Sequence, residues 1–457
     1  MSIVDSNAKF TQGSTLRHVI EVTLTGSIGL MAIFIVDLLN LFYIAQLGEQ
    51  ELAAAIGYAG VVLFFITSFG IGVSIAGTAL VSRALGAGDR AIAARVAGSS
   101  LAFMAIVMTI ASCAMLPVSH LIIGALGATG RTHAIADRFL WFVLPATVFL
   151  GLGMMQSGLL RALGDAQRAM WVTLAGGIAT AILDPILIFG FNLGVDGAAI
   201  ASIISRLVLA GVGHWGLVRV HRLPTWPTLA GMRQDVMPLA AIAVPAVLTN
   251  IATPVGNGFI TAMIARYGDA AVAGWAVLGR VTPVAFGVFF ALSGAIGPIL
   301  GQNLGARLFD RLKQAMVDSM IVVAVYGLFV WVILALSAHW LVAIFDAKGE
   351  AADVIHFFCV YASLGWVFNG ALFVANAAFN NLGFPTYSTA FNWGRATIGT
   401  VPFAMFGAWM GGTSYGPEGI IAGQAVGGIF FAIASVFVCF KVMDKMAAKA
   451  RAPASVP

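Results

Sequence analysis

The chain has 457 residues, of which 60% are hydrophobic and only 9% are charged, and its formal net charge is +5. A soluble protein carries roughly a quarter charged residues, so this composition excludes a water-soluble globular protein and predicts an integral membrane protein. The positive charge does not indicate nucleic-acid binding, because the basic residues are spread over many short loops and form no patch interleaved with aromatic residues.

Twelve apolar stretches alternate with short polar loops along the chain. Each has the ~20 residues that a helix needs to cross a hydrocarbon core about 30 Å thick. Because lipid cannot satisfy open backbone groups, each stretch is predicted to be a transmembrane helix, and the fold class is an all-α integral membrane protein. The predicted helices cover residues 18–45, 52–82, 93–124, 138–160, 169–191, 197–219, 238–265, 271–300, 315–344, 354–380, 388–410 and 419–441.

Lysine and arginine are distributed unevenly between the two sides of this predicted bundle. If the N-terminus is cytoplasmic, 17 of them lie on the cytoplasmic side, four on the opposite side and three within helices. Positive residues gather on the cytoplasmic side of membrane proteins, so both termini are predicted to be cytoplasmic and the protein to lie in the inner (plasma) membrane. The first 15 residues are polar and predict no cleavable signal peptide.

Three pairs of similar segments recur at an offset of 219 to 220 residues. The segment "IAQLGEQELAA" at 44–54 matches "IARYGDAAVAG" at 264–274, "ALGAGDR" at 84–90 matches "NLGARLF" at 303–309, and "RALGDAQ" at 161–167 matches "NNLGFPT" at 380–386. The chain is therefore predicted to be a tandem repeat of two six-helix lobes with the same direction, related by a pseudo-two-fold axis along the membrane normal. The expected parts are an N-terminal lobe with the ion site at 1–220, a cytoplasmic linker at 221–237, a C-terminal lobe at 238–445 and a short tail at 446–457.

Two aspartates lie deep inside predicted helices. Asp37 and Asp184 are each about ten residues before the outer end of their helix, which places both ~15 Å below the outer surface. A carboxylate at that depth costs roughly 2.5–3.5 kcal/mol by insertion scales, so each needs a compensating role. Two acids at one depth predict a shared site, and the alternative is that they only fix helix packing. The repeat favours a site, because Asn257 and Val401 stand at the corresponding positions of the second half.

The two acids predict an ion-coupling site. A buried carboxyl group favours its neutral form, and two close together favour sharing one proton, so the pair is expected to bind either a proton or a Na⁺. Further oxygen atoms are available nearby: Asn40 and Thr180 each lie one turn from one of the acids, and Ser202 lies on the next helix.

Three arginines also lie within predicted helices. Arg280 and Arg395, in the second half, are expected to bind helix-end carbonyls or to lock that lobe. Arg206 lies one turn after Ser202, and it either tunes the acids or has a structural role.

Catalytic motifs are weak or missing. Residues 86–89 read Gly-Ala-Gly-Asp, a string found in intramembrane aspartyl proteases, but Arg83 and Arg90 flank it in a cytoplasmic loop and no partner acid lies at its depth. The seven histidines show no metal-ligand spacing, and neither a nucleophile elbow nor a Walker loop is present. The chain is therefore predicted not to be an enzyme, to need no cofactor or resident metal, and to draw its energy from an ion gradient.

The sequence resembles the multidrug and toxic compound extrusion (MATE) family of transporters over residues 15–441. The resemblance rests on "VDLLNLFYIAQLGEQELAAAIG" in the first helix and its turn, "LLRALGDAQRAM" at 159–170, "ILDPILIFGFNLGVDGAAIAS" at 182–202 and "GPILGQNLGAR" at 297–307. Within the family it is most similar to the DinF-like branch, which places its two key aspartates in the N-terminal lobe, as at Asp37 and Asp184. The acids that the NorM-like branch carries in its seventh and tenth helices are missing here.

This resemblance implies polar partners for the two acids, with some departures from the branch. Thr180 stands where the branch has an asparagine, Ser202 stands for its sixth-helix threonine, and Gln156 or Ser157 occupies the polar position late in the fourth helix. A proline expected in the first helix is missing.

The function that the resemblance implies is an antiporter that exports cationic or amphipathic small molecules in exchange for H⁺ or Na⁺, as a monomer in the lipid bilayer. A flippase for lipid-linked oligosaccharides is the alternative within the same superfamily, although its cavity usually carries several arginines. The substrate cavity is expected to be a soft apolar surface suited to varied ligands. Its expected lining residues are Met31, Phe34, Tyr43, Met154 and Met155.

Overall fold

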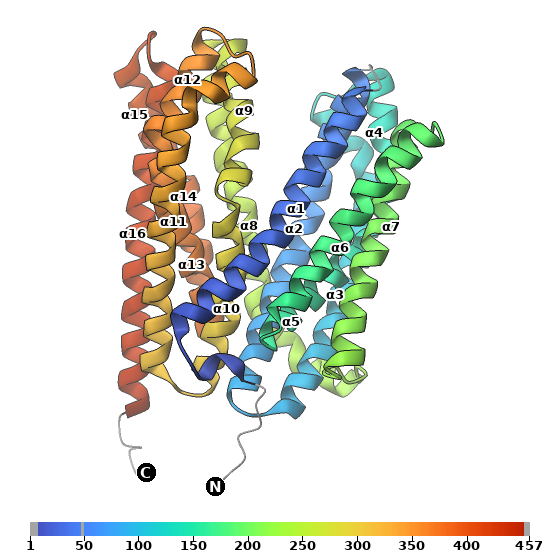
Figure 1. Ribbon diagram of the computed structural model, residues 1–457, viewed down its shortest axis with the longest axis vertical. Coiled ribbons are helices and arrows are strands. Elements are labelled where there is room, and N and C mark those ends of the chain that lie inside the picture. The colour runs from blue at the N-terminus through green and yellow to red at the C-terminus, as the bar shows by residue number, and fades with distance from the viewer. Residues whose placement is uncertain (1–7, 47–49, 452–457) are drawn as a thin grey trace. The chain divides into compact units, whose positions relative to one another are not determined.

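The computed structural model describes residues 8–46 and 50–451, and every regular element in these residues is a helix (Figure 1). The predicted all-α class is therefore confirmed. Contacts divide the described chain into two compact units, the first with residues 8–9, 24–46 and 50–247 and the second with residues 10–23 and 248–451.

These units differ from the expected lobes at the start of two helices. Residues 10–23 belong with the second unit, and residues 238–247 belong with the first. Part of the expected linker at 221–237 is helical, since α8 begins at Leu229. The first turns of α1 are therefore grouped with the second unit, and the first turns of α8 are grouped with the first unit.

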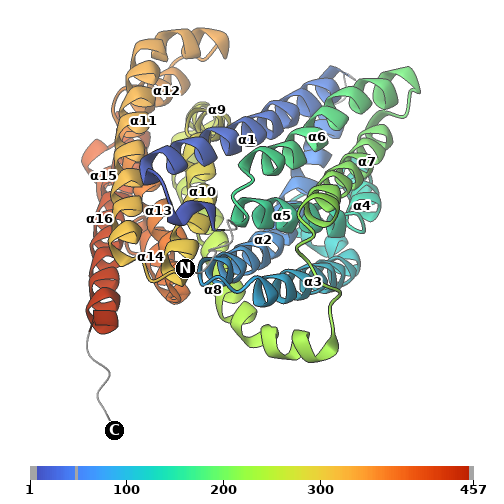
Figure 2. The ribbon, with the colours of Figure 1, turned by 60° about the horizontal axis from the view of Figure 1, so that its bottom comes forward.

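The first unit holds most of the helices of the first repeat. Helices α6 and α7, which carry several of the expected site residues, lie side by side (Figures 1 and 2). The elements are α1 (Thr15–Gln46), α2 (Gln50–Gly86), α3 (Arg90–Ala125), α4 (Gly130–Val143), α5 (Thr147–Ala162), α6 (Ala166–Pro185), the π-helical turn η2 (Ile186–Gly190), α7 (Gly194–His214) and a second π-helical turn η3 (Trp215–Val220).

The second unit repeats these elements at an offset near 220. Helices α3 and α11 both have 36 residues, and α2 spans residues 50–86 where α9 and α10 together span 269–305. The elements are α8 (Leu229–Ile264), η4 (Ala265–Tyr267), α9 (Asp269–Ala285), α10 (Gly287–Gly305), α11 (Phe309–Ile344), α12 (Glu350–Val360), η5 (Ala362–Gly365), α13 (Trp366–Leu382), α14 (Pro385–Ala396), α15 (Val401–Gly411) and α16 (Gly416–Arg451). These matching bounds confirm the predicted duplication.

Several predicted transmembrane helices are broken. Ten helices of the described chain are long and apolar enough to cross a membrane, and the pair α4–α5, bent by 54°, makes an eleventh span. The twelfth predicted span, 388–410, is α14 followed by α15, which have only 12 and 11 residues. Prolines explain breaks that apolarity does not reveal: Pro145 lies in the α4–α5 turn and Pro402 at the start of α15.

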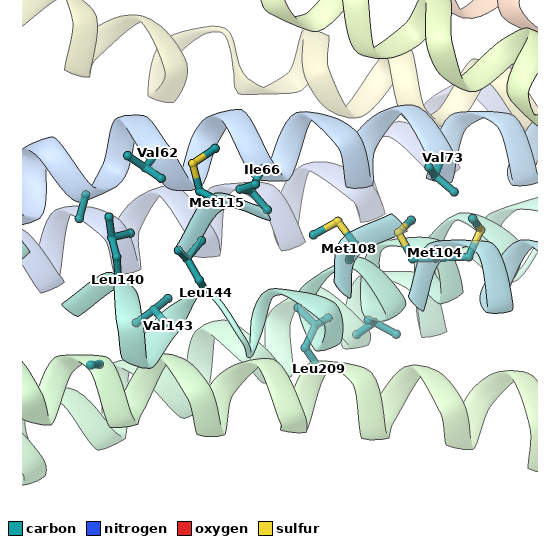
Figure 3. Packing of buried hydrophobic residues seen from close by; sticks show 14 of the residues in the cluster. Val62, Ile66, Val73, Met104, Met108, Met115, Leu140, Val143, Leu144 and Leu209 are labelled. Atoms are coloured by element: carbon teal, nitrogen blue, oxygen red, sulfur yellow. The ribbon is translucent and has the colours of Figure 1, made fainter. Parts of the chain in front are cut away.

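The interior of the first unit is filled by aliphatic side chains, mostly leucine, alanine and valine, together with methionines (Figure 3). Met104 and Met108 of α3 meet Leu144, at the α4–α5 bend, and Leu209 of α7, and all four are at most 7% exposed. Gly151 of α5 permits this approach, because a Cβ there would lie 2.7 Å from Cγ of Met108. Flexible methionines fill the irregular space beside the bent helix.

The segment before α1 is anchored in the second unit. The Phe10 side chain is fully buried, its backbone N–H donates to Gln302 Oε1 at 2.9 Å, and its carbonyl accepts from Asn303 Nδ2 at 3.1 Å. The guanidinium of Arg311 donates to three backbone carbonyls of this segment at 2.8 to 3.1 Å. The segment's backbone is therefore satisfied by α10 and α11.

Two Gly-Asp pairs end one helix and begin the next. Gly88 and Gly164 have φ angles of +80° and +81°, the left-handed region that favours glycine. The following residues, Asp89 and Asp165, cap α3 and α6, each accepting from the backbone N–H three residues later at 2.8 and 3.0 Å. This capping role accounts for the protease-like string at 86–89 without any catalytic function.

Asp165 also binds two basic side chains. Its Oδ2 lies 2.5 Å from Arg168 Nη1 and 2.7 Å from His221 Nε2. Burial raises the pKa of the Asp165 carboxyl, but the hydrogen bonds from Arg168 and His221 outweigh it, and the pKa lies below its ordinary value of 3.8. A lowered folded-state pKa means that this stabilisation is present at neutral pH and is lost as the pH falls below about 4.

We expect Asp165→Asn to reduce the free energy of unfolding by about 1 kcal/mol at pH 7, since charge-assisted hydrogen bonds become neutral ones. The difference between variant and wild type should shrink as the pH is lowered below about 4. Denaturant unfolding in detergent between pH 7 and pH 3 measures it. A difference that stays constant over this range would contradict the charge-based role of Asp165.

Candidate functional site

The buried acid of the candidate site is Asp184, near the end of α6. Its side chain is only 1% exposed. Pro185 follows it and ends the regular α-helix, and residues Ile186–Gly190 continue as a π-helical turn. Such turns are frequent at functional sites because they redirect side chains and backbone carbonyls. The chain therefore places a carboxyl group where its helix becomes irregular.

Only one oxygen of the Asp184 carboxyl has a partner in the described chain. Asn40 of α1 donates from Nδ2 to Oδ2 at 2.8 Å, whereas Oδ1 is buried and has no hydrogen-bond partner there. A buried polar atom without a partner costs about 1–3 kcal/mol, and more when it is charged. A proton on Oδ1, or a cation beside it, would remove this cost.

Small residues bring α1 close to α6 and place Asn40 beside Asp184. A Cβ added to Gly177 of α6 would lie 3.7 Å from atoms of Ala32 and Val36 on α1. Val36 and Asn40 are four residues apart and therefore share a helix face. Asn40 thus meets α6 one turn beyond this close contact, at the level of Asp184.

The second acid, Asp37, lies next to this contact on α1. Its side chain is exposed, whereas that of Asp184 is buried. The two carboxyl groups lie close enough for their charges to interact. The structure therefore brings Asp37, Asp184 and Asn40 together, as the sequence predicts, and makes one acid accessible and the other enclosed.

The two hydroxyl residues expected near the acids lie on the facing surfaces of α6 and α7. Thr180, one turn before Asp184, donates to the carbonyl of Gly176 at 3.1 Å, which leaves its oxygen lone pairs available. Ser205 of α7 donates to the same carbonyl at 2.7 Å. Ser202 lies one turn before Ser205 and is half-buried. Thr180 and Ser202 thus extend the polar lining from the acids towards α7.

Gln156 does not belong to this cluster. It is 5% exposed, and it packs against Gly213 of α7, where a Cβ would lie 2.3 Å from its Oε1. Gln156 is about 9 Å from the end of α5 that meets α6, whereas Asp184 is about 27 Å along α6 from the same turn. Its position late in α5 therefore sets Gln156 at another depth than the acids in this arrangement.

The five residues expected to line a substrate cavity have different environments. Met31 and Phe34 of α1 and Met154 of α5 are half-buried. The ring of Tyr43 packs edge-on against a phenylalanine of the π-helical turn η2, with centroids 6.1 Å apart. Met155 is fully buried in the hydrophobic core, so it does not line a cavity in this conformation.

Arg206 and Arg280 have no part in the acid cluster. Arg206 of α7 donates to the carbonyl of Val143 at 2.8 Å, the last residue of α4. This bond satisfies a carbonyl at the α4–α5 bend. Two roles were expected for Arg206, tuning the acids or a structural role, and the bond fits the structural one. Arg280 of α9 is exposed.

Arg395 of α14 binds two neutral side chains from two other helices of the second unit, so of the two roles expected from the sequence the contacts agree with locking the lobe and not with binding helix-end carbonyls. Its Nη1 donates to Asn369 Oδ1 of α13 at 3.3 Å and its Nη2 donates to Thr253 Oγ1 of α8 at 3.0 Å. Its Nε is buried without a hydrogen-bond partner. No charged group of the described chain compensates the guanidinium. Sequence reasoning missed this cluster of Arg395, Thr253 and Asn369, which we call the arginine cluster.

Comparison with known proteins covers almost the whole chain. The model of a protein family described as MatE matches residues 27–186 and 245–406, one region in each half. A FAD transporter of Shewanella oneidensis is 29% identical over 444 residues, which cover 94% of this chain and 96% of that protein. The multidrug export protein MepA of Staphylococcus aureus is 24% identical over 374 residues, or 80% of this chain and 81% of that protein.

Solved structures agree with this assignment. A mutant of the MATE transporter VcmN from Vibrio cholerae has a TM-score of 0.88 at 25% identity and covers 94% of this chain and 97% of its own. A MOP superfamily transporter from Pyrococcus furiosus has a TM-score of 0.89 at 22% identity, and the match covers 96% of this chain and 98% of that chain. At this identity the comparison shows a similar fold and nothing more. The predicted twelve-helix, two-lobe architecture is therefore confirmed.

Proposed function

Because this chain belongs to the MatE family of membrane transporters, we propose that it is an antiporter that exports cationic or amphipathic small molecules in exchange for H⁺ or Na⁺. Asp37 and Asp184 bind the coupling ion in the first unit. The remaining proposals about orientation, site and substrate follow from this role.

The half-satisfied carboxyl of Asp184 is the observation that carries the proposal. Asn40 holds one oxygen while the other is buried without a partner in the described chain. The exposed Asp37 beside it is the acid that an ion reaches first. A proton then completes Asp184 at Oδ1, or a Na⁺ is shared by the two carboxyl groups and the oxygen atoms of Asn40, Thr180 and Ser202.

Ion binding changes how α1 lies on α6 in this scheme. With the site empty, the two negative charges repel each other, and a hydrogen bond from Asn40 to Asp184 connects α1 to α6. A bound cation or proton removes the repulsion and draws α1 towards the irregular end of α6. The half-buried Met31 and Phe34 of α1 move with it, so that substrate bound against them is released.

The energy available is sufficient for export against a gradient. One elementary charge that crosses 100 mV supplies about 2.3 kcal/mol. Since about 1.4 kcal/mol corresponds to a tenfold change, this supports a substrate gradient of roughly 50-fold.

The asymmetry of basic residues supports a plasma-membrane orientation with both termini cytoplasmic, and the pair of acids in the first half supports a DinF-like relationship.

Export of a flavin nucleotide is a second candidate function. It is supported by the likeness to the FAD transporter of Shewanella oneidensis, which extends over 94% of this chain. The lipid-linked oligosaccharide flippase finds no comparable support. Of the arginines that it would need, Arg206 is engaged by the Val143 carbonyl.

Transport by the purified protein in proteoliposomes tests the proposal. With ethidium as the probe, we expect export when a proton gradient or a sodium gradient is imposed, and none when both are collapsed. The gradient that drives export identifies the coupling ion. Export that is equally fast without any gradient, or is driven by neither gradient, would refute the antiporter assignment.

A further inference from the structure

The arginine cluster lies at a break in the middle of a membrane span. Arg395 is the eleventh residue of α14, and α15 begins at Val401 after a short interruption. At 1.5 Å per residue Arg395 lies ~15 Å from the start of α14, and α15 continues for ~16 Å beyond the break. Interrupted helices near the membrane midplane form ligand sites in transporters, because they expose polar groups that a continuous helix would hide.

The cluster positions a positive charge without neutralising it. A guanidinium has five N–H donors, and those of Arg395 bond only two acceptors in the described chain, both of them neutral. The N–H at Nε is buried and lacks an acceptor there. Because Thr253 and Asn369 come from different helices, they fix the direction of the guanidinium, whose charge has no counter-charge in the described chain. An oxyanion is the ligand that matches this combination.

The duplication shows that the arginine cluster and the break beside it occur together. At the positions that correspond to Thr253, Asn369 and Arg395, the first repeat has Ile33, Phe149 and Gly176. The corresponding helix of the first repeat, α6, is not interrupted there and continues to Pro185, whereas α14 ends at Ala396 and α15 begins at Val401. The charge and the interruption are thus features of the same repeat, as expected of a ligand site built at a broken helix.

We propose that Arg395, held by Thr253 and Asn369, binds an oxyanion, a phosphate or carboxylate group, of the exported amphipathic molecule. The proposal rests on the transport function above and adds to it a subsite for an anionic group, which substrates that carry such a group use and a cation such as ethidium does not. The two repeats then divide the work: the acids of the first unit take the coupling cation, and the arginine of the second unit takes the negative group of the substrate.

Riboflavin and flavin mononucleotide (FMN) provide a matched pair of probes, since they share one ring system and differ by a phosphate. Binding to the purified full-length protein in detergent is measured by quenching of flavin fluorescence. We expect the wild type to bind FMN roughly tenfold or more tightly than riboflavin, the range expected for hydrogen bonds to a charged group. Arg395→Gln should erase this preference while the affinity for riboflavin stays the same.

Control variants separate binding from a structural lock. Arg280→Gln removes another arginine of the same unit and should keep the preference for FMN. Arg395→Lys keeps the charge but loses the planar fork, and Thr253→Val loses one of the two supports, so each should reduce the preference in part. Equal binding of both probes by the wild type, an unchanged preference in Arg395→Gln, or an equal loss of both probes in that variant would overturn the proposal.

Lipid phosphate is the other source of the same chemistry. In nanodiscs of phosphatidylcholine, with or without phosphatidylglycerol, the preference for FMN should persist. Its loss in the presence of phosphatidylglycerol would assign the site to a lipid headgroup and overturn the substrate assignment. Gradient-driven ethidium export, measured on the same wild-type and Arg395→Gln proteins, tests the antiporter function separately. If the wild-type protein showed no gradient-driven export, the transport function would be refuted, while the binding result would still hold.

Discussion

Replacing Asp37 by asparagine should reduce gradient-driven ethidium export to the level of protein-free liposomes and leave the protein folded. Asparagine has nearly the same shape as aspartate, but it neither carries the proton nor balances the charge of a bound cation. The Asp37 side chain is exposed, so no packing is lost with its charge. Export rates in proteoliposomes, together with the elution profile and thermal unfolding in detergent, measure both parts of this expectation.

Asp184→Asn should abolish export as well, with a different effect on stability. The substitution replaces a buried, half-satisfied carboxyl by a neutral group, so the variant should unfold at the same temperature as the wild type or at a higher one. Asp196→Asn is the matched control and should keep export. Asp196 lies in the same unit, at the start of α7, but it pairs with Arg138 of α4 and is not part of the candidate ion site. Wild-type export by Asp37→Asn would show that this acid is not needed for coupling.

Much of the fold follows from the composition and from the duplication. Apolar stretches long enough to cross a bilayer have few alternatives to helices, which is why each of the twelve predicted spans is helical in the described chain, as one helix or as two in succession. The interruptions were less predictable. Hydropathy does not distinguish a continuous helix from α9 followed by α10, or from α14 followed by α15, since both halves of each pair are apolar.

The candidate ion site was predictable where depth along a helix decides the contact. Counting residues from the outer turns placed Asp37 and Asp184 at one level, and Asn40 one turn from Asp37 therefore reached Asp184. The same counting applied to Gln156 sets it close to the turn between α5 and α6, far along the bundle from the acids.

The arginine cluster required knowledge of which helices are neighbours. Thr253, Asn369 and Arg395 are far apart in sequence, and a single arginine in an apolar stretch does not reveal whether its partners are carbonyls, acids or neutral side chains. Comparing the repeats would have marked all three positions, because each has an apolar or small residue in the first half.

The position of Arg395 depends on how α15 packs on α16. Three glycines of α16, at four-residue intervals, face the backbone of the segment that follows Arg395: Cβ atoms on Gly419, Gly423 and Gly427 would lie 2.1, 2.1 and 1.6 Å from backbone carbonyl oxygens. The last of these oxygens belongs to Gly399, in the break between α14 and α15. Small residues at this spacing allow helix backbones to approach directly in membranes.

Gly427→Ala should therefore separate the break from α16 and reduce the free energy of unfolding by about 1–3 kcal/mol or more, because a rigid carbonyl cannot move aside as a flexible side chain would. Gly428→Ala, one residue later, is the control: a Cβ there meets nothing within 4 Å, and alanine favours the helix by roughly 1 kcal/mol. Thermal unfolding in detergent should show a lower midpoint for Gly427→Ala alone. The preference for FMN over riboflavin should fall in the same variant, since Gly399 lies four residues after Arg395. Equal stability of the two alanine variants would mean that α15 does not rest on α16 through these glycines, and the position of Arg395 would then need another support.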